Sequence, residues 1–370
     1  MSGSPAAGRP IRTAVVGLGW AARSIWLPRL HRHPGFAVAA AVDPDPASRA
    51  AVAGDGSGTP VLASVHDLDP AGVDLAVVAV PNHLHCAVAE SLLLKGIAVF
   101  MEKPVCLNSA EAERLAAAER TGGATLLAGS AARHRADIGA LLDVAAGLGP
   151  IRHVELAWVR ARGVPDAGGW FTRRDLSGGG ALVDLGWHLF DVAAPLLGDG
   201  DFAHVTGVVS SDFIGRRSAR AAWRDDEAGA LPEGTTDVED TVRSFLVTEG
   251  GTSVSLHASW ASHEALDTTY VRVEGSEGSA ALRCTFGFSP NRAGGSVLTR
   301  TSDGETRAVP VPEEPIGTEY DRQLDALPAQ LHDPAGRGRV IEEVRRTIGA
   351  IERVYASART TQENRQSVPA

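Results

Sequence analysis

Lysine is nearly absent from this chain, and one of its two lysines stands where a reacting charge would be useful. The chain has 35 basic residues, of which only Lys95 and Lys103 are lysines. Lys103 follows residues 97–101, an apolar run typical of a buried strand, and precedes Pro104. An ammonium is a compact charge whose pKa can be shifted, so it can stabilise negative charge that develops in a reaction. The alternative is a lysine that only caps the end of a strand.

A second passage pairs a carboxylate with an imidazole. Residues 178–191 read GGGALVDLGWHLFD, in which three glycines lead into a helical stretch. Asp184 and His188 are four residues apart, so a helix places them on one face. The carboxylate would hold one tautomer of the imidazole and raise its basicity, which makes His188 a candidate proton acceptor near neutral pH. Asp191 is a second candidate partner, and the alternative for the group is a helix-surface ion pair worth about 0.3–0.5 kcal/mol.

The N-terminal segment has the order of elements that a dinucleotide site needs. A short apolar strand at 14–16 is followed by GLGWAA at 17–22 and by a helical stretch to about residue 31. Gly17 permits the tight turn, Gly19 lets the backbone approach a pyrophosphate, and Ala22 allows the helix to pack closely on the strand. The N–H groups at the start of that helix would face the phosphates. A glycine pattern alone is weak, because such turns are common.

A carboxylate at the end of the next strand strengthens this interpretation. Residues 36–42 are a continuous apolar run like a buried parallel strand, and Asp43 follows them, 26 residues after Gly17. That spacing is near the one expected for the acidic residue that binds the adenosine ribose hydroxyls. A carboxylate would repel a 2′-phosphate, so Asp43 favours NAD over NADP. The alternative is a turn aspartate before Pro44.

The rest of the sequence predicts two different kinds of β-sheet, one in each half of the chain. Strand-like runs at 73–80, 97–101 and 124–128 alternate with helical stretches at 84–95 and 109–121, which predicts a doubly wound parallel sheet. After Gly129 and a helical piece at 136–146, apolar and polar residues alternate instead, at 151–162, 203–209, 242–248, 252–260, 269–274 and 280–283. Turns at 249–251 and 276–278 predict hairpins in a mainly antiparallel sheet, and a helix at about 340–358 follows.

Composition limits the class of protein and its partners. With 370 residues, the chain is long enough for two domains. A formal charge of −10 argues against a nucleic-acid partner. The three widely spaced cysteines contain no CxxC pair, and no apolar run approaches about 20 residues, so we expect a cytoplasmic protein with no membrane partner. His83 and His85 are two apart on a helix start, with no third ligand evident, so no metal is predicted.

Three ordered motifs resemble one family. They are GLGWAA at 17–22, VPNHLHCAVAESLLLKGIAVFMEKP at 80–104 and GGGALVDLGWH at 178–188. Together they are similar to the glucose-fructose oxidoreductase, inositol dehydrogenase and MocA-like family over nearly the whole chain. The resemblance implies an α/β fold with an N-terminal Rossmann doubly wound parallel sheet and a C-terminal α+β domain whose large sheet is mostly antiparallel. We therefore expect a flexible N-terminus at 1–10, an NAD-binding Rossmann domain at 11–130, and a substrate-binding and oligomerisation domain at 131–370. Homodimers or homotetramers would form through that second sheet.

Residue roles follow from the resemblance position by position. His188 would take the hydroxyl proton, Lys103 would stabilise the developing alkoxide, and Asp184 would orient the pair. The implied cofactor-binding residues are Gly17, Leu18, Gly19, Trp20, Ala21, Ala22, Asp43, Val80, Pro81, Asn82, His85, Glu102 and Lys103. The candidate substrate-binding residues are Lys103, Arg133, Trp170, Asp184 and His188. The chain departs from the family pattern at Ala22, in place of the third glycine, and at Ala131 and Ala132, where larger polar residues are common.

The expected activity is that of an NAD-dependent dehydrogenase acting on a secondary hydroxyl of a sugar, amino sugar or cyclitol, or on the corresponding ketone. The alternative is a non-catalytic regulatory protein of the same fold that binds NAD and sugar. Such relatives typically lose the lysine or the histidine, and both are present here. A third reading keeps the catalysis but acts on an imine or an aryl diol. Four arginines before the glycine-rich passage, Arg160, Arg162, Arg173 and Arg174, could meet an anionic substrate or form a solvated face. The composition suggests a high-GC genome, where such enzymes often serve amino-sugar or antibiotic pathways.

Overall fold

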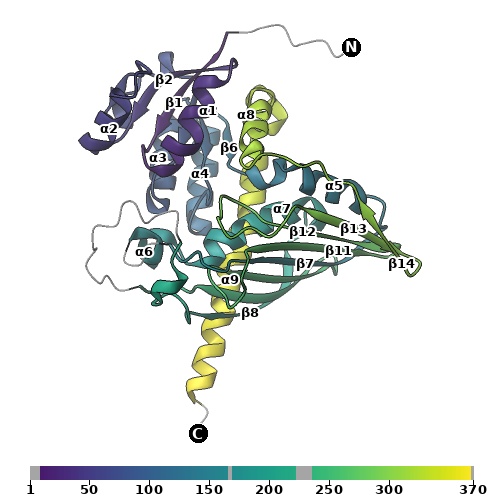
Figure 1. Ribbon diagram of the computed structural model, residues 1–370. Coiled ribbons are helices and arrows are strands. Elements are labelled where there is room, and N and C mark those ends of the chain that lie inside the picture. The colour runs from purple at the N-terminus through teal and green to yellow at the C-terminus, as the bar shows by residue number, and fades with distance from the viewer. Residues whose placement is uncertain (1–8, 166–168, 222–235, 368–370) are drawn as a thin grey trace, which may run out of the picture. The chain divides into compact units, whose positions relative to one another are not determined.

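The computed structural model describes residues 9–165, 169–221 and 236–367, and the chain forms two compact units (Figure 1). The first, here called the Rossmann unit, comprises Met1–Gly129 and Tyr320–Val344. The second, the sheet unit, comprises Ser130–Glu319 and Arg345–Ala370. Most of the expected flexible N-terminus, residues 1–8, lies outside the described residues.

The Rossmann unit is built on a six-stranded parallel sheet. Its strands are β1 (Ile11–Val16), β2 (Phe36–Val42), β3 (Val61–Leu62), β4 (Leu75–Val78), β5 (Ala98–Met101) and β6 (Leu126–Ala128). Their order in the sheet is β3-β2-β1-β4-β5-β6. The order reverses between β1 and β4, so the carboxyl ends of these two strands border the crevice where doubly wound sheets bind ligands. The predicted Rossmann sheet is confirmed.

Helices connect these strands, and local capping defines where two of them begin. They are α1 (Leu27–Arg32), α2 (Pro46–Ala53), α3 (His85–Leu94) and α4 (Ser109–Gly122). At the start of α4, Asn108 Oδ1 accepts from the backbone N–H of Glu111 at 2.9 Å, while the Glu111 carboxylate accepts from the N–H of Leu107. This pair of hydrogen bonds is close to a capping box, with Asn in place of the usual Ser or Thr. Asp45 caps α2 in a similar way.

One segment from the second half of the chain packs with the Rossmann unit, which corrects the expected domain of residues 131–370. Helix α8 (Thr318–Leu331) supplies Leu324 and Leu327 to the same buried cluster as Trp26 and Leu30. Gln323 donates to the carbonyl of Ala128 at the end of β6. The physical reason is burial, because the apolar face of α8 is covered by the core of the Rossmann unit.

The sheet unit is built on eight strands. They are β7 (Ile151–Val159), β8 (Phe202–Ser210), β9 (Thr241–Thr248), β10 (Ser253–Ser259), β11 (Thr268–Gly275), β12 (Gly278–Cys284), β13 (Val297–Ser302) and β14 (Glu305–Val309). The order is β14-β13-β12-β11-β7-β10-β9-β8, and every pair is antiparallel except β7 with β10. The predicted large, mostly antiparallel sheet is confirmed, including hairpins at 249–251 and 276–278.

Helices cover one face of this sheet (Figure 1). Helix α5 (Ala136–Ala145) packs on β12 and β13, and α7 (Trp187–Leu197) packs on β7. Helix α9 (Arg339–Ser367) packs on β8, where an added Cβ on Gly207 would lie 2.8 Å from Val354. Along β7, Val154, Leu156 and Trp158 on the covered face are buried, and the residues on the other face are half-buried. The helices therefore bury one side of the sheet and leave the other side open.

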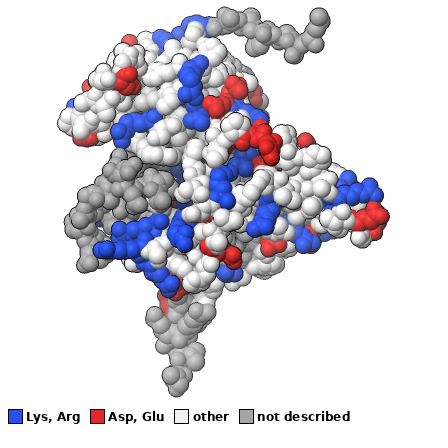
Figure 2. All heavy atoms as spheres, in the orientation of Figure 1, with Lys and Arg blue, Asp and Glu red and all other residues white. Residues whose placement is uncertain are grey.

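The hairpin of β13 and β14 projects from the edge of this sheet. Strand β14 is exposed at almost every position, and Arg307 pairs there with Glu305 at 2.6 Å. Basic and acidic side chains lie side by side at this hairpin (Figure 2). Charged residues on an edge strand discourage pairing with the strands of other molecules.

One apolar stretch of the sheet unit, Arg174–Leu197, is long and apolar enough to cross a membrane by length and composition. It comprises the short helix α6 (Arg174–Ser177), the turn η7 (Leu182–Gly186) and α7. Within its most apolar window, 61% of the residues are buried inside the protein. Burial of this kind is typical of a core helix, and the cytoplasmic location stays a prediction.

Candidate active site

The glycine turn after β1 has the shape of a phosphate-binding turn. Gly17 has a φ of 87°, and an added Cβ would lie 2.7 Å from the carbonyl oxygen of Ala79. A side chain is therefore excluded at this position. An added Cβ on Gly19 would meet nothing within 4 Å, so the backbone there is open to a ligand. Of the other predicted residues of this turn, Leu18 and Ala22 are buried, while Trp20 and Ala21 are at least partly exposed.

Asp43 is fixed beside this turn. Its Oδ2 accepts from the backbone N–H of Leu18 at 2.7 Å, and its Oδ1 accepts from that of Asp45 at 2.8 Å. The guanidinium of Arg49 donates to the carbonyl oxygens of Asp43 and Pro44. The carboxylate thus has a set orientation at the end of β2, where a Rossmann fold places its ribose-binding acid.

His85 joins the loops that follow β4 and β5. Its ring is buried, with Nδ1 2.6 Å from the carbonyl oxygen of Pro104 and Nε2 2.9 Å from that of Val80. Burial lowers the pKa of His85 to about 4, against the opposing effect of these two carbonyls. Both ring nitrogens contact backbone carbonyls. The role that the ring can have in cofactor binding is therefore to position the loops after β4 and β5. Of the other predicted residues here, Asn82 is buried and Pro81 is half-buried.

Glu102 and Lys103 follow β5 directly. Glu102 Oε1 accepts from the indole N–H of Trp26 at 2.8 Å, and Oε2 accepts from the backbone N–H of Lys103 at 3.0 Å. Burial raises the pKa of Glu102, while the charge of Lys103 and these hydrogen bonds oppose the rise. The carboxylate therefore ties the end of β5 to the helical turn η1 (Ala22–Trp26). Lys103 is half-buried and precedes a cis peptide bond to Pro104.

In the sheet unit, the glycines of the second motif make room for a buried carboxylate. An added Cβ on Gly180 would lie 1.8 Å from the carbonyl oxygen of Glu239, and one on Gly179 would lie 2.0 Å from the Tyr355 hydroxyl oxygen. Glu239 Oε1 accepts from the N–H groups of Gly180 and Leu182 and from the Tyr355 hydroxyl, at 2.8–3.1 Å. Burial raises the pKa of Glu239, against the opposing hydrogen bonds. The start of the helix that follows is thereby fixed from two sides.

That helix carries Asp184 and His188. Asp184 lies in η7, a single π-helical turn, and His188 lies in the first turn of α7. The indole N–H of Trp260, which is fully buried, donates to Asp184 Oδ2 at 2.9 Å. The ring of His188 lies 5.5 Å from that of Trp158. Both candidate residues are half-buried, and π turns often occur at functional sites.

The remaining predicted residues occupy several places. Arg133 contacts the His188 helix, because its Nε lies 2.9 Å from Asp191 Oδ1 and donates to the Asp191 carbonyl. Asp191, a candidate partner of His188, thus pairs with Arg133. Trp170 lies on the turn before α6, with its ring 4.0 Å from that of Phe171. Ala131 and Ala132 are buried. Lys103 belongs to the Rossmann unit, and Asp184 and His188 belong to the sheet unit.

Within the described residues, no group of three or more His, Cys, Asp and Glu side chains could hold a metal ion. His85 uses both ring nitrogens on backbone carbonyls.

Three supporting residues were not predicted from the sequence: Glu239, Trp260 and Tyr355. A local signal for Glu239 is the acidic pair that it forms with Asp240, directly before the alternating segment 242–248. Trp260 and Tyr355 lie 76 and 116 residues from their partners and carry no local signal.

The glycines of the second motif give a stability prediction. Gly180→Ala should lower the free energy of unfolding by about 1–3 kcal/mol, because its Cβ would overlap the backbone of Glu239. Urea unfolding measures the change. Gly139→Ala on α5 is the control, since nothing lies within 4 Å of its added Cβ. It should raise stability by about 0.5–1 kcal/mol. Equal stability of Gly180→Ala and wild type would contradict the packing described here.

Comparison with known proteins agrees with this architecture. Residues 11–130 match the family described as an oxidoreductase family with an NAD-binding Rossmann fold, and residues 144–281 match the GFO/IDH/MocA C-terminal domain. The chain therefore belongs to the Gfo/Idh/MocA family of oxidoreductases. Family membership, fold class and enzyme class are confirmed as the sequence predicts.

Two relatives and one solved structure illustrate the range of similarity. The chain is 58% identical to the "Putative UDP-kanosamine synthase oxidoreductase subunit" of Amycolatopsis mediterranei, over 97% of this chain and 99% of the relative. It is 29% identical to the dTDP-3,4-didehydro-2,6-dideoxy-alpha-D-glucose 3-reductase of Streptomyces antibioticus, over 54% of this chain and 60% of that protein. The aldose-aldose oxidoreductase of Caulobacter crescentus has the same fold, with a TM-score of 0.74, 24% identity, and coverage of 95% and 98% of the two chains.

Proposed function

We propose that this enzyme oxidises the C3 hydroxyl of a nucleotide-linked hexose to a ketone with NAD as the oxidant. The similarity that supports this most is 58% identity, over 97% of the chain, to a relative named for UDP-kanosamine synthesis. Kanosamine carries an amine at C3 where glucose carries a hydroxyl, and a ketone at that carbon is the group to which an amine can be added. The more distant dTDP-sugar reductase is also named for position 3.

The Rossmann unit offers a place for the dinucleotide. Gly17 permits the turn, the open backbone at Gly19 can approach a pyrophosphate, and the oriented carboxylate of Asp43 can accept from the ribose hydroxyls. When bound, the nicotinamide ring supplies the hydride acceptor. The half-buried ammonium of Lys103 would stabilise the negative charge that develops on the substrate oxygen.

Proton transfer is assigned to the sheet unit. As the C3–H bond breaks, the O–H proton passes to the imidazole of His188 and a C=O bond forms. Asp184 orients and stabilises the charged imidazole, since a carboxylate favours imidazolium. The indole N–H of Trp260 holds Asp184 Oδ2, which restricts the carboxylate to one arrangement. The carboxylate and the imidazole on one anchored helix are the observation that carries this proton-transfer step.

Formation of NADH, followed by absorbance, tests the proposal directly. UDP-glucose, dTDP-glucose, free glucose and myo-inositol are supplied with NAD, and the ketone is located by borodeuteride reduction and NMR. Turnover of a nucleotide-linked glucose with a ketone at C3 is the expected result. Oxidation at another carbon, or of inositol alone, would overturn the proposal. Tight NAD binding with no turnover of any sugar would favour the regulatory protein instead.

Asp43 should determine the choice between NAD and NADP. Asp43→Ser removes the charge that repels a 2′-phosphate and one acceptor for the ribose hydroxyls, so the ratio of kcat/KM for NAD over NADP should fall by about 10- to 100-fold. Steady-state kinetics with both cofactors measure it. Asp45→Ser is the control, because Asp45 caps α2 and serine keeps that role. An unchanged ratio in Asp43→Ser would place the ribose-binding group elsewhere.

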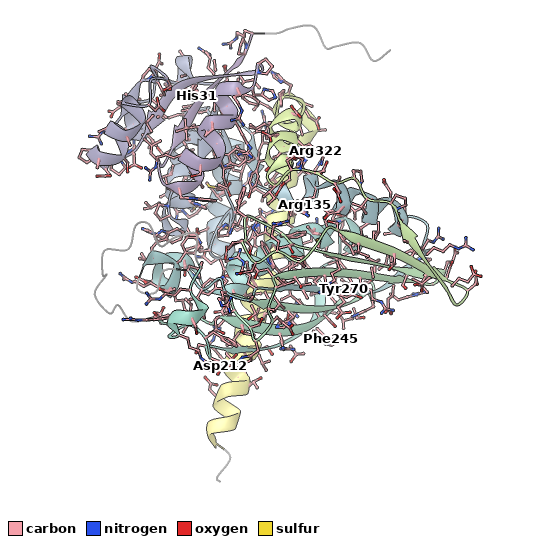
Figure 3. The ribbon with its side chains drawn as sticks, viewed as in Figure 1. His31, Arg135, Asp212, Phe245, Tyr270 and Arg322 are labelled. Atoms are coloured by element: carbon pink, nitrogen blue, oxygen red, sulfur yellow. The ribbon has the colours of Figure 1, made fainter. Side chains whose placement is uncertain are left out.

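We further propose that two copies of the chain associate through the open face of the eight-stranded sheet. Phe245 on β9 is 45% exposed and Val208 on the neighbouring β8 is 42% exposed, and Tyr270 on β11 shares their face (Figure 3). Exposed aromatic residues of this kind are common at interfaces.

The name of the closely similar relative includes the word subunit, which favours a second protein as well. An enzyme that transfers an amine would consume the C3 ketone.

Light scattering after size exclusion tests the homo-oligomer. The wild type should have the mass of a dimer or tetramer, and Phe245→Arg should shift it toward the monomer by placing a charge in the interface. Leu94→Arg is the control, because Leu94 is 52% exposed at the end of α3 in the Rossmann unit. A monomeric wild type, or an oligomer unaffected by Phe245→Arg, would remove this proposal.

A further inference from the structure

A chain of side-chain contacts leads from the candidate base to a guanidinium. The rings of His188 and Trp158 lie 5.5 Å apart. On the same strand end, the Cζ of Arg160 lies over the indole of Trp158, 5.0 Å from its centre. The candidate proton acceptor and a permanent positive charge therefore contact the same indole, and all three residues belong to the sheet unit.

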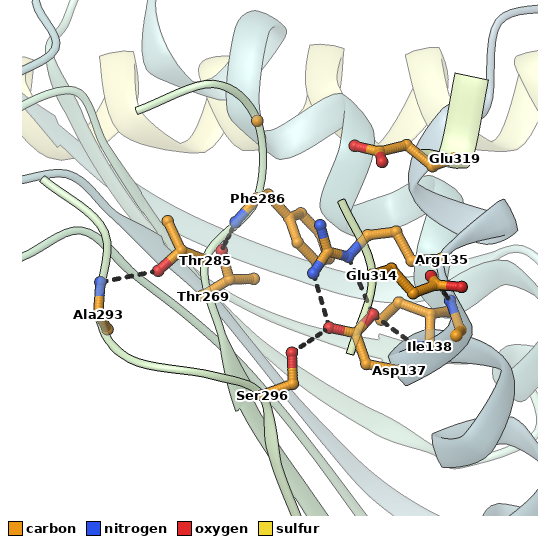
Figure 4. Close-up of polar contacts among 12 residues, drawn as sticks. Arg135, Asp137, Ile138, Thr269, Thr285, Phe286, Ala293, Ser296, Glu314 and Glu319 are labelled. Atoms are coloured by element: carbon orange, nitrogen blue, oxygen red, sulfur yellow. Dashed lines mark hydrogen bonds and ion pairs between the residues drawn. The ribbon is translucent and has the colours of Figure 1, made fainter. Parts of the chain in front are cut away.

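The indole between them is held in place. Trp158 is 4% exposed and packs edge-on against Phe286, with the ring centres 5.3 Å apart. Phe286 in turn carries the guanidinium of Arg135 over its ring (Figure 4). Arg135 donates to both oxygens of Asp137 at 2.9 and 2.6 Å, and Ser296 donates to the same carboxylate. Although burial opposes it, the bond to Arg135 lowers the pKa of Asp137, so this support stays charged.

The stem of Arg160 is also positioned. An added Cβ on Gly163 would lie 2.4 Å from Arg160 Cδ, so the absence of a side chain at Gly163 makes the space in which the arginine lies. The backbone N–H of Arg160 donates to the carbonyl of Ser259 at 3.0 Å. The side chain is thus held between Gly163 and Trp158. Because its rotamers are already restricted, it loses little conformational entropy when a ligand binds.

Within the part of the chain that the structure describes, the guanidinium of Arg160 forms no ion pair with a carboxylate. Two other arginines that precede the glycine motif do, since Arg173 pairs with Asp175 and Arg174 with Glu239. A guanidinium that lies over an indole keeps the N–H groups that do not face the ring available to a ligand. Those groups match the oxygens of a phosphate in a two-point contact.

We propose that Arg160 binds the phosphate attached to C1 of the sugar, and so selects phosphorylated or nucleotide-linked hexoses over free ones. This inference rests on the function proposed above. C1 and C3 of a hexose are separated by one ring carbon, so a phosphate on C1 lies within about one ring's width of the C3 hydroxyl. Arg160 and His188 both contact the indole of Trp158, which places the guanidinium within one side chain of the candidate base. The arrangement fits a phosphate on C1 when the C3 hydroxyl meets His188.

Binding of UDP tests the inference without any turnover. Calorimetry is run on the full chain saturated with NAD, comparing wild type, Arg160→Gln, Arg160→Lys and the control Arg152→Gln, which removes an exposed charge at the other end of β7. Arg160→Gln should weaken UDP binding by about 10- to 100-fold, and Arg160→Lys by less, since it keeps the charge but loses the planar contact. Arg152→Gln should bind as wild type does. Equal weakening by Arg160→Gln and Arg152→Gln, or by neither, would overturn the inference.

Kinetics identify the source of the phosphate. UDP-glucose, glucose 1-phosphate and methyl α-glucoside are compared in wild type and Arg160→Gln. A 10- to 100-fold rise in KM for the phosphorylated substrates, with kcat/KM for the glucoside unchanged, supports the inference. A rise for both phosphorylated substrates assigns the contact to the phosphate on C1, whereas a rise for UDP-glucose alone would place it on the second phosphate or the nucleoside and overturn the inference. Similar losses on all three would make Arg160 structural and overturn it. If no sugar is oxidised at all, the proposed function fails, while the UDP measurement still decides the role of Arg160.

Discussion

Lys103→Met should lower kcat by about 10²- to 10³-fold and leave NAD binding unchanged. Methionine keeps the length and apolar stem of lysine but carries no charge, so the developing alkoxide loses its stabilising cation. NAD binding should persist, because the glycine turn and Asp43 do not involve this ammonium. Stopped assays of NADH formation give kcat, and fluorescence titration gives the dissociation constant of NAD.

The chain supplies a matched control for this change in its only other lysine. Lys95 Nζ donates to the carbonyl oxygens of Val65 and His66 at 3.0 and 3.1 Å, away from the candidate residues. Lys95→Met should therefore keep kcat within about twofold of wild type. If Lys103→Met turned over as fast as Lys95→Met, Lys103 would be a strand-end cap and the assignment would be wrong.

His188→Ala should lower kcat by about 10²- to 10⁴-fold and also change the shape of the pH profile. An imidazole titrates between about pH 5 and 8, so the rate of oxidation in wild type should rise with pH as the ring loses its proton. Without His188 the rise to a plateau should disappear, because water, which does not titrate over this range, then takes the proton. The measurement is kcat for oxidation from pH 5 to 9.

Added imidazole separates a chemical role from a structural one. If His188 accepts the proton, free imidazole should partly restore the rate of His188→Ala in proportion to its unprotonated fraction. His332→Ala, an exposed histidine at the end of α8, is the control and should show the wild-type profile. A wild-type profile in His188→Ala would mean that another group takes the proton.

The sequence was sufficient for the Rossmann sheet because its signals are local. Strand, glycine turn and helix follow one another within about 20 residues, and apolar runs such as 36–42 identify strands that are covered on both faces. Elements whose stability depends on distant partners were missed. Strand β14 is exposed at nearly every position, so it has no apolar alternation to detect. Helix α8 was missed too, and its burial depends on residues of the first 130.

For the candidate site, too, local features could be predicted and distant contacts could not. The four-residue spacing of Asp184 and His188 predicts that they share a helix face, because both lie in one helix. The contact of Asp184 with the indole of Trp260 could not be predicted, because Trp260 is 76 residues away. The π turn at Leu182–Gly186 also escaped prediction, since it depends on a shift in backbone hydrogen bonding that no single residue type dictates. Glu239 and Tyr355 account for two of the three glycines in the motif, because an added Cβ on Gly180 or on Gly179 would overlap them.

The contact between Gly179 and Tyr355 constrains which parts of this enzyme can be exchanged with those of a relative. Helix α9 lies near the C-terminal end of the chain, yet its Tyr355 hydroxyl reaches the carboxylate that starts the His188 helix. A chimera that takes α9 from one parent and the glycine motif from another must therefore inherit Gly179, Glu239 and Tyr355 together. A side chain at Gly179 beside a retained Tyr355 would collide, and a phenylalanine at 355 would leave Glu239 one donor short. These three residues must therefore be exchanged together, although they are spread over 177 residues of sequence.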